Sequence, residues 1–383
     1  MGMDFRENAA GFRAGRTAFS AVTLFDVSHQ RVTTAGQVNL PQSTGKPSRI
    51  DRGTRLAWMA AHEALAQAGL AGGAMPMIVG TSAAAMPIGE DYYRAAVSGA
   101  EKRHLQLRRV ETYQAQRQLA DMARLLGIDG PIRIVSNACA SGANAIGQAF
   151  HLVRSGRAER VLAGGYDALC QLVFAGFDAL QALSPSGIPR PFDAARDGLA
   201  LGEGAGFVVV ETAGSAKSRG ARVIAEISGY GAATDIHHLT QPHPQGDAAL
   251  ATMRAACAMA GISPQQIDYL NSHGTGTPLN DVAEAIAIQR WAGAAVSAIQ
   301  VSSTKSAIGH LLGGAGAVES VICLMALEGQ WLPASLHVRE ADPVCTFDLI
   351  RTPRDARVRR VLTNSFGFGG ANATLIFARE DSA

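Results

Sequence analysis

Cys139 is the residue whose position most clearly suggests covalent chemistry. An apolar run typical of a β-strand precedes it, and a helical pattern of apolar residues follows at Ala143, Ile146, Phe150 and Val153. A cysteine between such elements lies at or near a helix N-terminus, where unpaired N–H groups and the helix dipole favour the thiolate. We therefore predict a nucleophile that accepts an acyl group, although a buried structural cysteine would look the same in isolation.

A second candidate segment begins at His273, directly after a predicted strand. Glycines beside the histidine allow a ligand to approach the backbone, and Thr275 and Thr277 supply hydroxyl groups on the same loop. Asp281 and Glu284 open the next predicted helix, where carboxylates interact favourably with the helix dipole. For these two acids a functional role and a simple helix-start role remain equally open.

A third segment, residues 303–319, also follows a predicted strand. It places Lys305 and His310 on either side of a turn, and a helix of small residues comes next. Glu319 lies on the otherwise apolar face of that helix. Because a buried carboxylate needs a partner, we predict that Glu319 pairs with Lys305 across the loop.

The fourth segment, residues 364–372, is a glycine-rich turn between two predicted strands. Its glycines allow backbone N–H groups to point inward, which is one way to build an oxyanion hole. A phosphate-binding loop is the competing interpretation. We reject it because the required GxxxxGK[ST] spacing is absent and no helix follows.

Together these residues suit acyl transfer through a thioester. Two histidines that donate hydrogen bonds to one oxygen would stabilise an enolate. Such a pair favours carbon–carbon bond formation over hydrolysis, for which one general-base histidine is sufficient.

The elements expected to position these residues alternate between strand and helix in both halves, which predicts α/β architecture with covered sheets. Strands are predicted at residues 77–79, 161–163, 207–211, 223–228, 267–270, 300–303, 361–362 and 374–377, and helices at 52–69, 247–260, 279–291 and 316–327. Residues 88–128 resemble a helical insert. The polar stretch 212–222 marks an internal boundary, so we predict an N-terminal half at 1–218 and a C-terminal half at 219–383.

The composition of the chain limits which partners, metal sites and cellular locations remain open. The 383 residues carry a formal net charge of +2, which gives no general case for nucleic-acid binding. Basic clusters at 102–109 and 351–360 are either solvated surface or docking sites that steer an acidic partner. Five cysteines without a CxxC spacing argue against disulfides and zinc. We find no signal pattern and no apolar run of membrane-spanning length, and therefore expect a cytoplasmic protein without membrane attachment.

These segments resemble the β-ketoacyl-acyl-carrier-protein synthases, in particular the elongating branch with a Cys-His-His site. The resemblance spans residues 18–377 and includes a further family motif at 191–206. It implies a thiolase-like fold, a duplicated five-layered αβαβα arrangement that is usually a homodimer. The initiating branch lacks the motifs around His273 and His310, thiolases use a second cysteine, and chain-length factors lack the nucleophile.

The resemblance also implies residue roles. Cys139 would carry the acyl chain, and His273 and His310 would hold the enolate formed when malonyl-carrier protein loses carbon dioxide. Lys305, with Glu319, would orient the site electrostatically. The backbone N–H groups of Cys139 and Phe368 would form the oxyanion hole.

Further implied contacts concern the substrates. The Phe368 ring would gate the acyl pocket, and Phe366 would lie beside the substrate. Thr275 and Thr277 would contact the phosphopantetheine arm. No metal or nucleotide cofactor is implied, since phosphopantetheine arrives on the acyl carrier protein. The expected partners are this carrier, acyl and malonyl thioesters, and a second copy or a related subunit.

Two features depart from the family pattern. The opening strand and turn of the family are absent, so we expect one core strand to be missing. Asn137 stands where threonine or serine is usual, beside the nucleophile. The leading hypothesis is a condensing enzyme of fatty acid, polyketide or polyene synthesis, which the sequence does not separate. The alternative is a non-catalytic partner subunit of a ketosynthase heterodimer.

Overall fold

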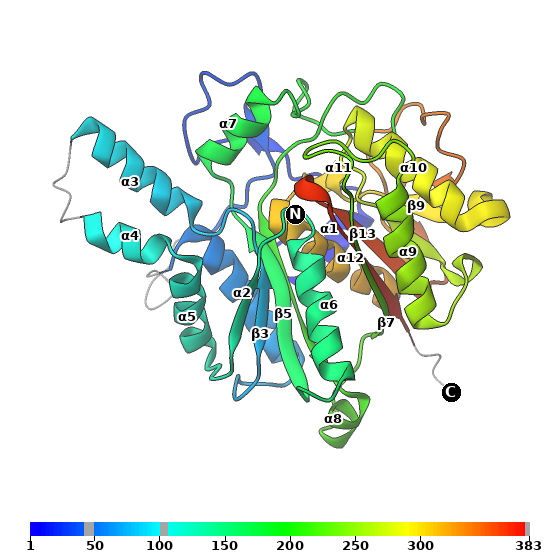
Figure 1. The fold of residues 1–383 in the computed structure, drawn as a ribbon, viewed down its shortest axis with the longest axis horizontal. Coiled ribbons are helices and arrows are strands. Elements are labelled where there is room, and N and C mark those ends of the chain that lie inside the picture. Colours follow the sequence, from blue (N-terminus) through cyan, green and yellow to red (C-terminus); the bar gives the residue numbers. More distant parts are fainter. Residues whose placement is uncertain (42–49, 100–105, 380–383) are drawn as a thin grey trace.

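The computed structural model describes residues 1–41, 50–99 and 106–379, which form two main β-sheets packed with helices (Figure 1). The first sheet has the strand order β4-β3-β5-β6. Its strands are β3 (Met77–Gly80), β4 (Ile132–Val135), β5 (Arg160–Asp167) and β6 (Gly204–Glu211). β3 runs parallel to β4 and β5, whereas β6 runs antiparallel to β5.

The second sheet repeats this arrangement, with the order β11-β9-β8-β13-β14-β7. Its strands are β7 (Glu226–Thr234), β8 (Tyr269–Asn271), β9 (Gln300–Ser302), β11 (Asp348–Leu349), β13 (Arg360–Phe366) and β14 (Ala371–Ala378). β9, β8 and β13 are parallel, and β14 is antiparallel to β13. The strand order of the two halves therefore shows the duplication that the resemblance implied.

The two sheets differ at both edges, because the second sheet has an additional strand at each edge, β11 beside β9 and β7 beside β14. In the second sheet, β7 pairs with the outer edge of β14 over most of its length. Within the described part of the chain, no strand pairs with the corresponding edge of β6, so the first sheet has four strands. In the described residues, the first sheet thus lacks a counterpart of β7, which agrees with the expectation that one core strand is missing.

Five layers follow from the packing of the helices. α2 (Arg52–Gln67) covers the outer face of the first sheet, and α9 (Asp247–Ala260) and α10 (Pro278–Ala292) cover the outer face of the second. α6 (Ser141–Arg154) and α12 (Ala315–Gly329) lie between the sheets, where they share one apolar core with both. The αβαβα arrangement is thus as predicted.

Alternation along the strands explains why both faces of each sheet are buried. In β5, Val161 and Ala163 belong to the central core, whereas Leu162 packs in the outer core with α2. In β13, Val361 faces the central layer and Leu362 faces α9 and α10. Successive strand residues point to opposite faces of the sheet, so a continuous apolar run packs against the helices on both faces.

The predicted helical insert forms an arm (Figure 1) that consists of α3 (Met86–Ser98), α4 (Leu107–Tyr113) and α5 (Ala115–Leu126). α5 packs on the outer core of the first sheet, whereas α3 and α4 project away from the body. Neither α3 nor α4 contains a fully buried residue. The basic pair Lys102 and Arg103 lies outside the described residues.

Several elements were not predicted. The N-terminal segment forms α1 (Phe5–Arg13), which is capped by Asp4 and buries Phe12 against α12. The interval predicted as a boundary contains α8 (Ala213–Ser218), and β7 begins three residues later than predicted. The other short elements are β1 (Ser20–Ala21), β2 (Thr34–Ala35), α7 (Gln171–Ala179), α11 (Lys305–Ile308), β10 (Trp331–Leu332) and β12 (Arg354–Asp355).

One stretch in the described residues, Leu312–Gly329, is long and apolar enough to cross a membrane by length and composition. The window is not a continuous apolar run, because it contains Glu319 and Glu328. Moreover, 72% of this window is buried inside the protein, because α12 is the central helix between the two sheets. Its apolar character is that of a core helix.

Candidate active site

The site forms where the carboxyl ends of strands from both sheets meet. Cys139 comes four residues after β4 ends, and His273 comes two residues after β8 ends. Lys305 and His310 follow β9, and Phe366 is the last residue of β13. Loops at the carboxyl ends of parallel strands lie on one edge of a sheet, so the fold gathers four distant sequence segments.

Cys139 occupies a tight turn between β4 and α6. The preceding residue, Ala138, has φ = +55°, a left-handed conformation that costs a residue with a side chain about 1–2 kcal/mol. α6 begins two residues after Cys139, with Ala140 as its N-cap. The side chain is 7% exposed. The predicted location at a helix N-terminus is confirmed.

Two opposing effects act on the charge state of Cys139. Burial raises the pKa of the thiol to about 11, and this outweighs the opposing effects of the Lys305 charge and of backbone N–H groups. Burial therefore favours the neutral thiol at rest, whereas the helix N-terminus on its own favours the thiolate. A base must remove the proton when the sulfur reacts.

His310 is placed to be that base. Its Nε2 atom lies 3.0 Å from the Sγ atom of Cys139. Burial and the nearby Lys305 charge hold the pKa of His310 well below its usual value, so the ring is neutral. Its Nδ1 atom has no hydrogen-bond partner among the described residues, so no contact fixes the ring in one tautomer.

His273 lies beside His310, with ring centroids 5.3 Å apart and planes at 85°. The Nζ atom of Lys305 is 3.3 Å from the Nδ1 atom of His273. An ammonium can only donate, so Nδ1 accepts and the proton of the neutral ring lies on Nε2. Burial, Lys305 and His310 together lower the pKa of His273 well below its usual value. His273 therefore offers a fixed N–H donor.

Lys305 also forms the predicted ion pair with Glu319. The two side chains are 1% and 2% exposed. Burial raises the pKa of Glu319 to about 7 against the opposing effect of Lys305. The carboxylate compensates the buried ammonium and keeps it beside His273, so Glu319 acts through Lys305 and does not line the cavity.

Asp281 and Glu284, whose roles were open, hold the loop that carries His273. Glu284 accepts hydrogen bonds from the backbone N–H groups of His273 (2.9 Å) and Gly274 (2.7 Å). Asp281 accepts from the N–H groups of Gly276 and Phe192. Both carboxylates are about 1% exposed and fix backbone. Their role is to position the loop.

The glycine-rich turn places its backbone against the nucleophile. A side chain at Gly367 would lie 3.1 Å from the carbonyl oxygen of Asn137 and from the nitrogen of Cys139. Gly370 has φ = +83°, and a Cβ there would lie 1.9 Å from the carbonyl oxygen of Asp235. The N–H of Phe368 points at the sulfur of Cys139. This geometry fits the predicted oxyanion hole.

The Phe368 ring lies at the cavity wall, 41% exposed. It stacks on the ring of Phe177 from α7, with centroids 6.0 Å apart and planes at 14°. Phe366 packs against His273 instead, with centroids 5.5 Å apart. Thus both phenylalanines border the cavity, as predicted, but they contact different groups.

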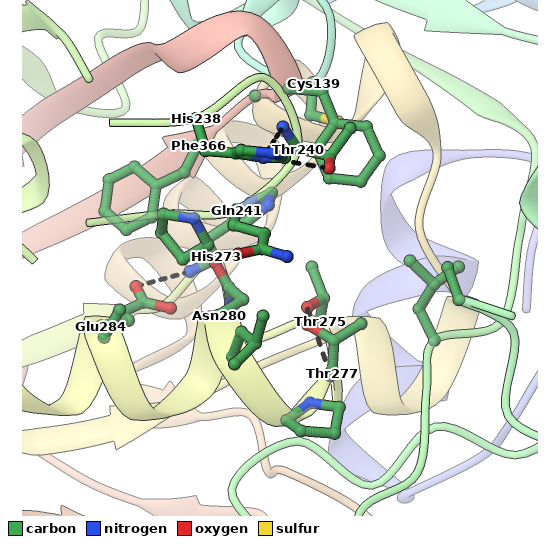
Figure 2. Close-up of a pocket in the computed structure, with 18 of the residues that line it drawn as sticks. Cys139, His238, Thr240, Gln241, His273, Thr275, Thr277, Asn280, Glu284 and Phe366 are labelled. Carbon is green, nitrogen blue, oxygen red and sulfur yellow. Dashed lines mark hydrogen bonds between the residues drawn. The ribbon is translucent and has the colours of Figure 1, made fainter. Parts of the chain in front are cut away.

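A cavity of about 370 Å³ connects Cys139 to solvent. Figure 2 shows Thr275 and Thr277 on its wall, with their hydroxyl groups 2.8 Å apart. Sequence reasoning missed the opposite wall, which comes from the loop after β7 and from α7. Its lining residues are Phe177, Leu180, His238, Leu239, Thr240 and Gln241. The two adjacent histidines in this loop were the available signal.

The basic cluster at residues 351–360, which we considered for carrier docking, lies at the wrong end of the sheet. Arg360 begins β13, whereas Phe366 at the site ends it. The two residues are about 20 Å apart along the strand. Moreover, Arg354 forms an ion pair with Asp348. The cluster therefore does not border the cavity, and its role in steering the carrier stays a prediction.

With this geometry described, comparisons with known proteins identify the family. A model of the β-ketoacyl synthase N-terminal domain matches residues 6–216, and a model of the β-ketoacyl synthase C-terminal domain matches residues 224–339. A 3-oxoacyl-[acyl-carrier-protein] synthase 2 of Synechocystis sp. is 35% identical, with 96% of this chain and 92% of the relative covered.

Solved structures agree with this similarity. A chain of the ishigamide ketosynthase/chain length factor superposes with a TM-score of 0.90 at 32% identity, covering 98% of this chain and 95% of that chain. A chain from a type II polyketide synthase complex, an acyl-carrier protein with its ketosynthase bound to a hexaketide, gives 0.87 at 27% identity, with the same coverage.

The chain belongs to the β-ketoacyl synthase family. The predicted family, thiolase-like fold and acyltransferase class are thereby confirmed.

Proposed function

We propose that this enzyme joins an acyl group held on Cys139 to the two-carbon unit of malonyl-acyl-carrier protein, with loss of carbon dioxide. One observation carries the proposal: the thiol of Cys139 lies 3.0 Å from His310, and His273 lies against His310 on the wall of the same cavity. A hydrolase needs one such histidine, whereas an enolate oxygen is best held by two donors.

In the first half-reaction the sulfur of Cys139 attacks the carbonyl carbon of an acyl thioester on the carrier. The thiol proton passes to Nε2 of His310 and then to the departing carrier thiolate. The N–H groups of Cys139 and Phe368 stabilise the tetrahedral oxyanion. The acyl group is then a thioester of Cys139.

In the second half-reaction the malonyl thioester loses carbon dioxide, and the electron pair of the broken bond forms an enolate. The Nε2–H of His273, fixed by Lys305, donates to the enolate oxygen, and so does His310 in its Nε2–H tautomer. The enolate carbon attacks the acyl carbonyl carbon and the bond to Cys139 breaks. A 3-oxoacyl thioester, two carbons longer, remains on the carrier, and the Cys139 thiolate takes a proton from water.

The phosphopantetheine arm of the carrier would pass along Thr275 and Thr277, whose hydroxyl groups border the cavity between Cys139 and solvent. These steps require no metal or further cofactor, because the pantetheine arrives with the substrate. The direct test is to mix the purified enzyme with acyl- and malonyl-carrier protein and to detect the 3-oxoacyl product by mass spectrometry. Absence of this product with every acyl donor would contradict the proposal.

The alternative function, a non-catalytic partner subunit, finds no support in the site. Such a subunit has no need of a thiol, two histidines and a buried lysine in contact. Here Lys305 contacts His273, and His310 contacts Cys139. The rings of His273 and His310 lie against each other and join the two pairs, and Lys305 is also paired with Glu319. The predicted cytoplasmic location remains part of this proposal.

Phe368→Ala tests the gate. Because the ring borders the cavity and rests on Phe177, we expect its removal to broaden the range of accepted acyl lengths and to lower condensation about tenfold through misplaced acyl groups. Acylation rates over a series of chain lengths measure this. An unchanged length profile would show that the ring does not limit the pocket.

We propose further that the carrier docks on the apolar rim of the cavity mouth. Leu180, Leu239 and Leu279 line the cavity with 62%, 73% and 55% of their surfaces exposed, and Ile236, next to this rim, is 94% exposed. Contiguous exposed apolar side chains around a pocket are typical of a protein-binding surface.

Ile236→Asp is expected to raise the KM for carrier-bound substrate about threefold to tenfold, because it places a charge in an apolar contact. Turnover of a pantetheine-linked mimic should not change. Val223→Asp is the matched control, since Val223 is 58% exposed but precedes β7, whereas Ile236 follows it. Equal effects of the two variants would contradict docking at this rim.

We propose a second copy of this chain as the dimer partner. The projecting α3 and α4 expose Tyr93 (68%), Val97 (70%) and Leu107 (67%), and β4 is an edge strand whose first residues are exposed. Such surfaces are seldom left open to solvent. Sedimentation of the purified chain at the mass of two copies would support this proposal. A monomer that assembles only with a related chain would favour the heterodimer.

A further inference from the structure

Asp167 is a buried carboxylate that the proposed reaction does not use. It is the last residue of β5, fully buried, and lies outside the cavity lining. It accepts hydrogen bonds from the Thr81 hydroxyl (2.6 Å) and from the backbone N–H groups of Gly313 (2.7 Å), Ala83 (2.9 Å) and Ser82 (3.0 Å). None of these donors carries a positive charge.

The donors belong to turns with unusual backbone conformations. Ala84 (φ = +47°) donates its N–H to Asp167, and Leu312 (φ = +50°) directly precedes the donor Gly313. Left-handed conformations are unfavourable for residues with a side chain and persist only where surrounding contacts hold them. The carboxylate thus ties together the turn after β3 and the turn after His310.

A third strained turn is reached through Ser82. While its N–H binds Asp167, its hydroxyl donates to the carbonyl oxygen of Ala138 at 3.0 Å. Ala138 has φ = +55° and directly precedes Cys139. The same carbonyl also accepts from Ser141 at the start of α6. The route from Asp167 to the nucleophile is therefore two hydrogen bonds and one peptide unit.

Asp167 consequently contacts both sides of the reacting pair. On one side Gly313 lies three residues after His310, and on the other Ser82 holds the residue before Cys139. We propose that Asp167 is a positioning residue that holds the sulfur of Cys139 and the Nε2 atom of His310 at their reacting distance. This inference rests on the proposed function, which assigns the acyl transfer to this pair.

A carboxylate is well suited to this position because it can accept from about four directions and carries no N–H of its own. An asparagine amide has one acceptor oxygen and would turn its NH₂ group toward N–H donors. The charge has a cost, since Asp167 raises the pKa of the Cys139 thiol while Lys305 lowers it. The negative charge of Asp167 thus lies near the nucleophile although it opposes ionisation of the Cys139 thiol.

Asp167→Asn provides the main test. We expect kcat for condensation to fall about tenfold to 100-fold through misalignment, while the KM for carrier-bound substrate stays the same. The pKa of the Cys139 thiol, measured from the pH dependence of alkylation by iodoacetamide, should fall because a negative charge has gone. Loss of folding would also expose Cys139 and lower the pKa of its thiol, so the circular dichroism spectrum and melting temperature of the variant must match those of the wild type for this result to count.

Two further variants keep the test decisive. Asp193→Asn is the matched control, because Asp193 is 2% exposed and accepts backbone N–H bonds from Ala195, Arg339 and Glu340 away from Cys139. Ser82→Ala removes the link to Ala138 alone. We expect it to lower kcat about threefold to tenfold, the effect of one hydrogen bond. Because Ser82 is exposed, we expect this variant to fold like the wild type.

The inference is overturned if Asp167→Asn matches Asp193→Asn in kcat and thiol pKa, or if Ser82→Ala retains the wild-type kcat. These outcomes are distinct from a failure of the proposed function. If wild-type enzyme forms no 3-oxoacyl product, the function is wrong, whereas the alkylation profile of Cys139 is measurable without any condensation.

Discussion

Replacing Cys139 with serine is expected to reduce condensation at least about 1,000-fold, the scale of effect seen when a catalytic nucleophile is lost. A serine hydroxyl is far less acidic than a thiol, and neutral His310 is too weak a base to ionise it efficiently. Product formation from acyl- and malonyl-carrier protein measures the effect.

The matched control is Cys345→Ser, which changes a partly exposed free cysteine outside the cavity. This variant should retain wild-type turnover. If Cys139→Ser elongates acyl chains at the wild-type rate, the nucleophile has been assigned wrongly.

Cys139→Gln separates the two halves of the reaction. We expect it to abolish elongation but to retain release of carbon dioxide from malonyl-carrier protein. Decarboxylation needs the donors on the enolate oxygen and not the thiol, and the glutamine amide occupies the place of the acylated sulfur. Carbon dioxide release is measured in the absence of an acyl donor.

Adding His273→Ala or His310→Ala to Cys139→Gln should then lower carbon dioxide release about 100-fold to 1,000-fold, the usual effect of removing one oxyanion donor. The His273 change should be at least as severe, because Lys305 fixes its Nε2–H toward the cavity. Undiminished release in both double variants would reverse the division of roles between thiol and histidines.

Much of the fold was predictable because local pattern and tertiary context agree. Strands buried on both faces read as short apolar runs, and each is followed by a glycine-containing loop. Thus β3, α2, α9, α10 and α12 begin within two residues of their predicted starts. The segments around Cys139, His273 and His310 were recognisable because polar, nucleophilic or basic residues follow buried strands there with glycines beside them.

The elements that were missed depend on contacts distant in sequence. α1 is held in place by the packing of Phe12 against α12. The mostly polar sequence of α1 gives no indication of this contact. The loop at 235–246 becomes a cavity wall only because the fold places it opposite Thr275. No periodic pattern encodes either arrangement.

Electrostatics was the least predictable part of the site. The helix N-terminus suggested a thiolate at Cys139, but the degree of burial decides its pKa, and burial follows from the packing of both halves. Likewise, no pattern in the sequence singles out Asp167, which lies beyond the strand predicted at 161–163. Its importance follows from three turns that meet around it.

The most direct test of the account is to identify the residue that carries the acyl group. The enzyme is incubated with an acyl-carrier protein in the absence of malonyl-carrier protein, and its intact mass and proteolytic peptides are measured. The account predicts one acyl group per chain, on the peptide containing Cys139, which disappears when malonyl-carrier protein is added. An unmodified enzyme, or an acyl group on another residue, would contradict the account.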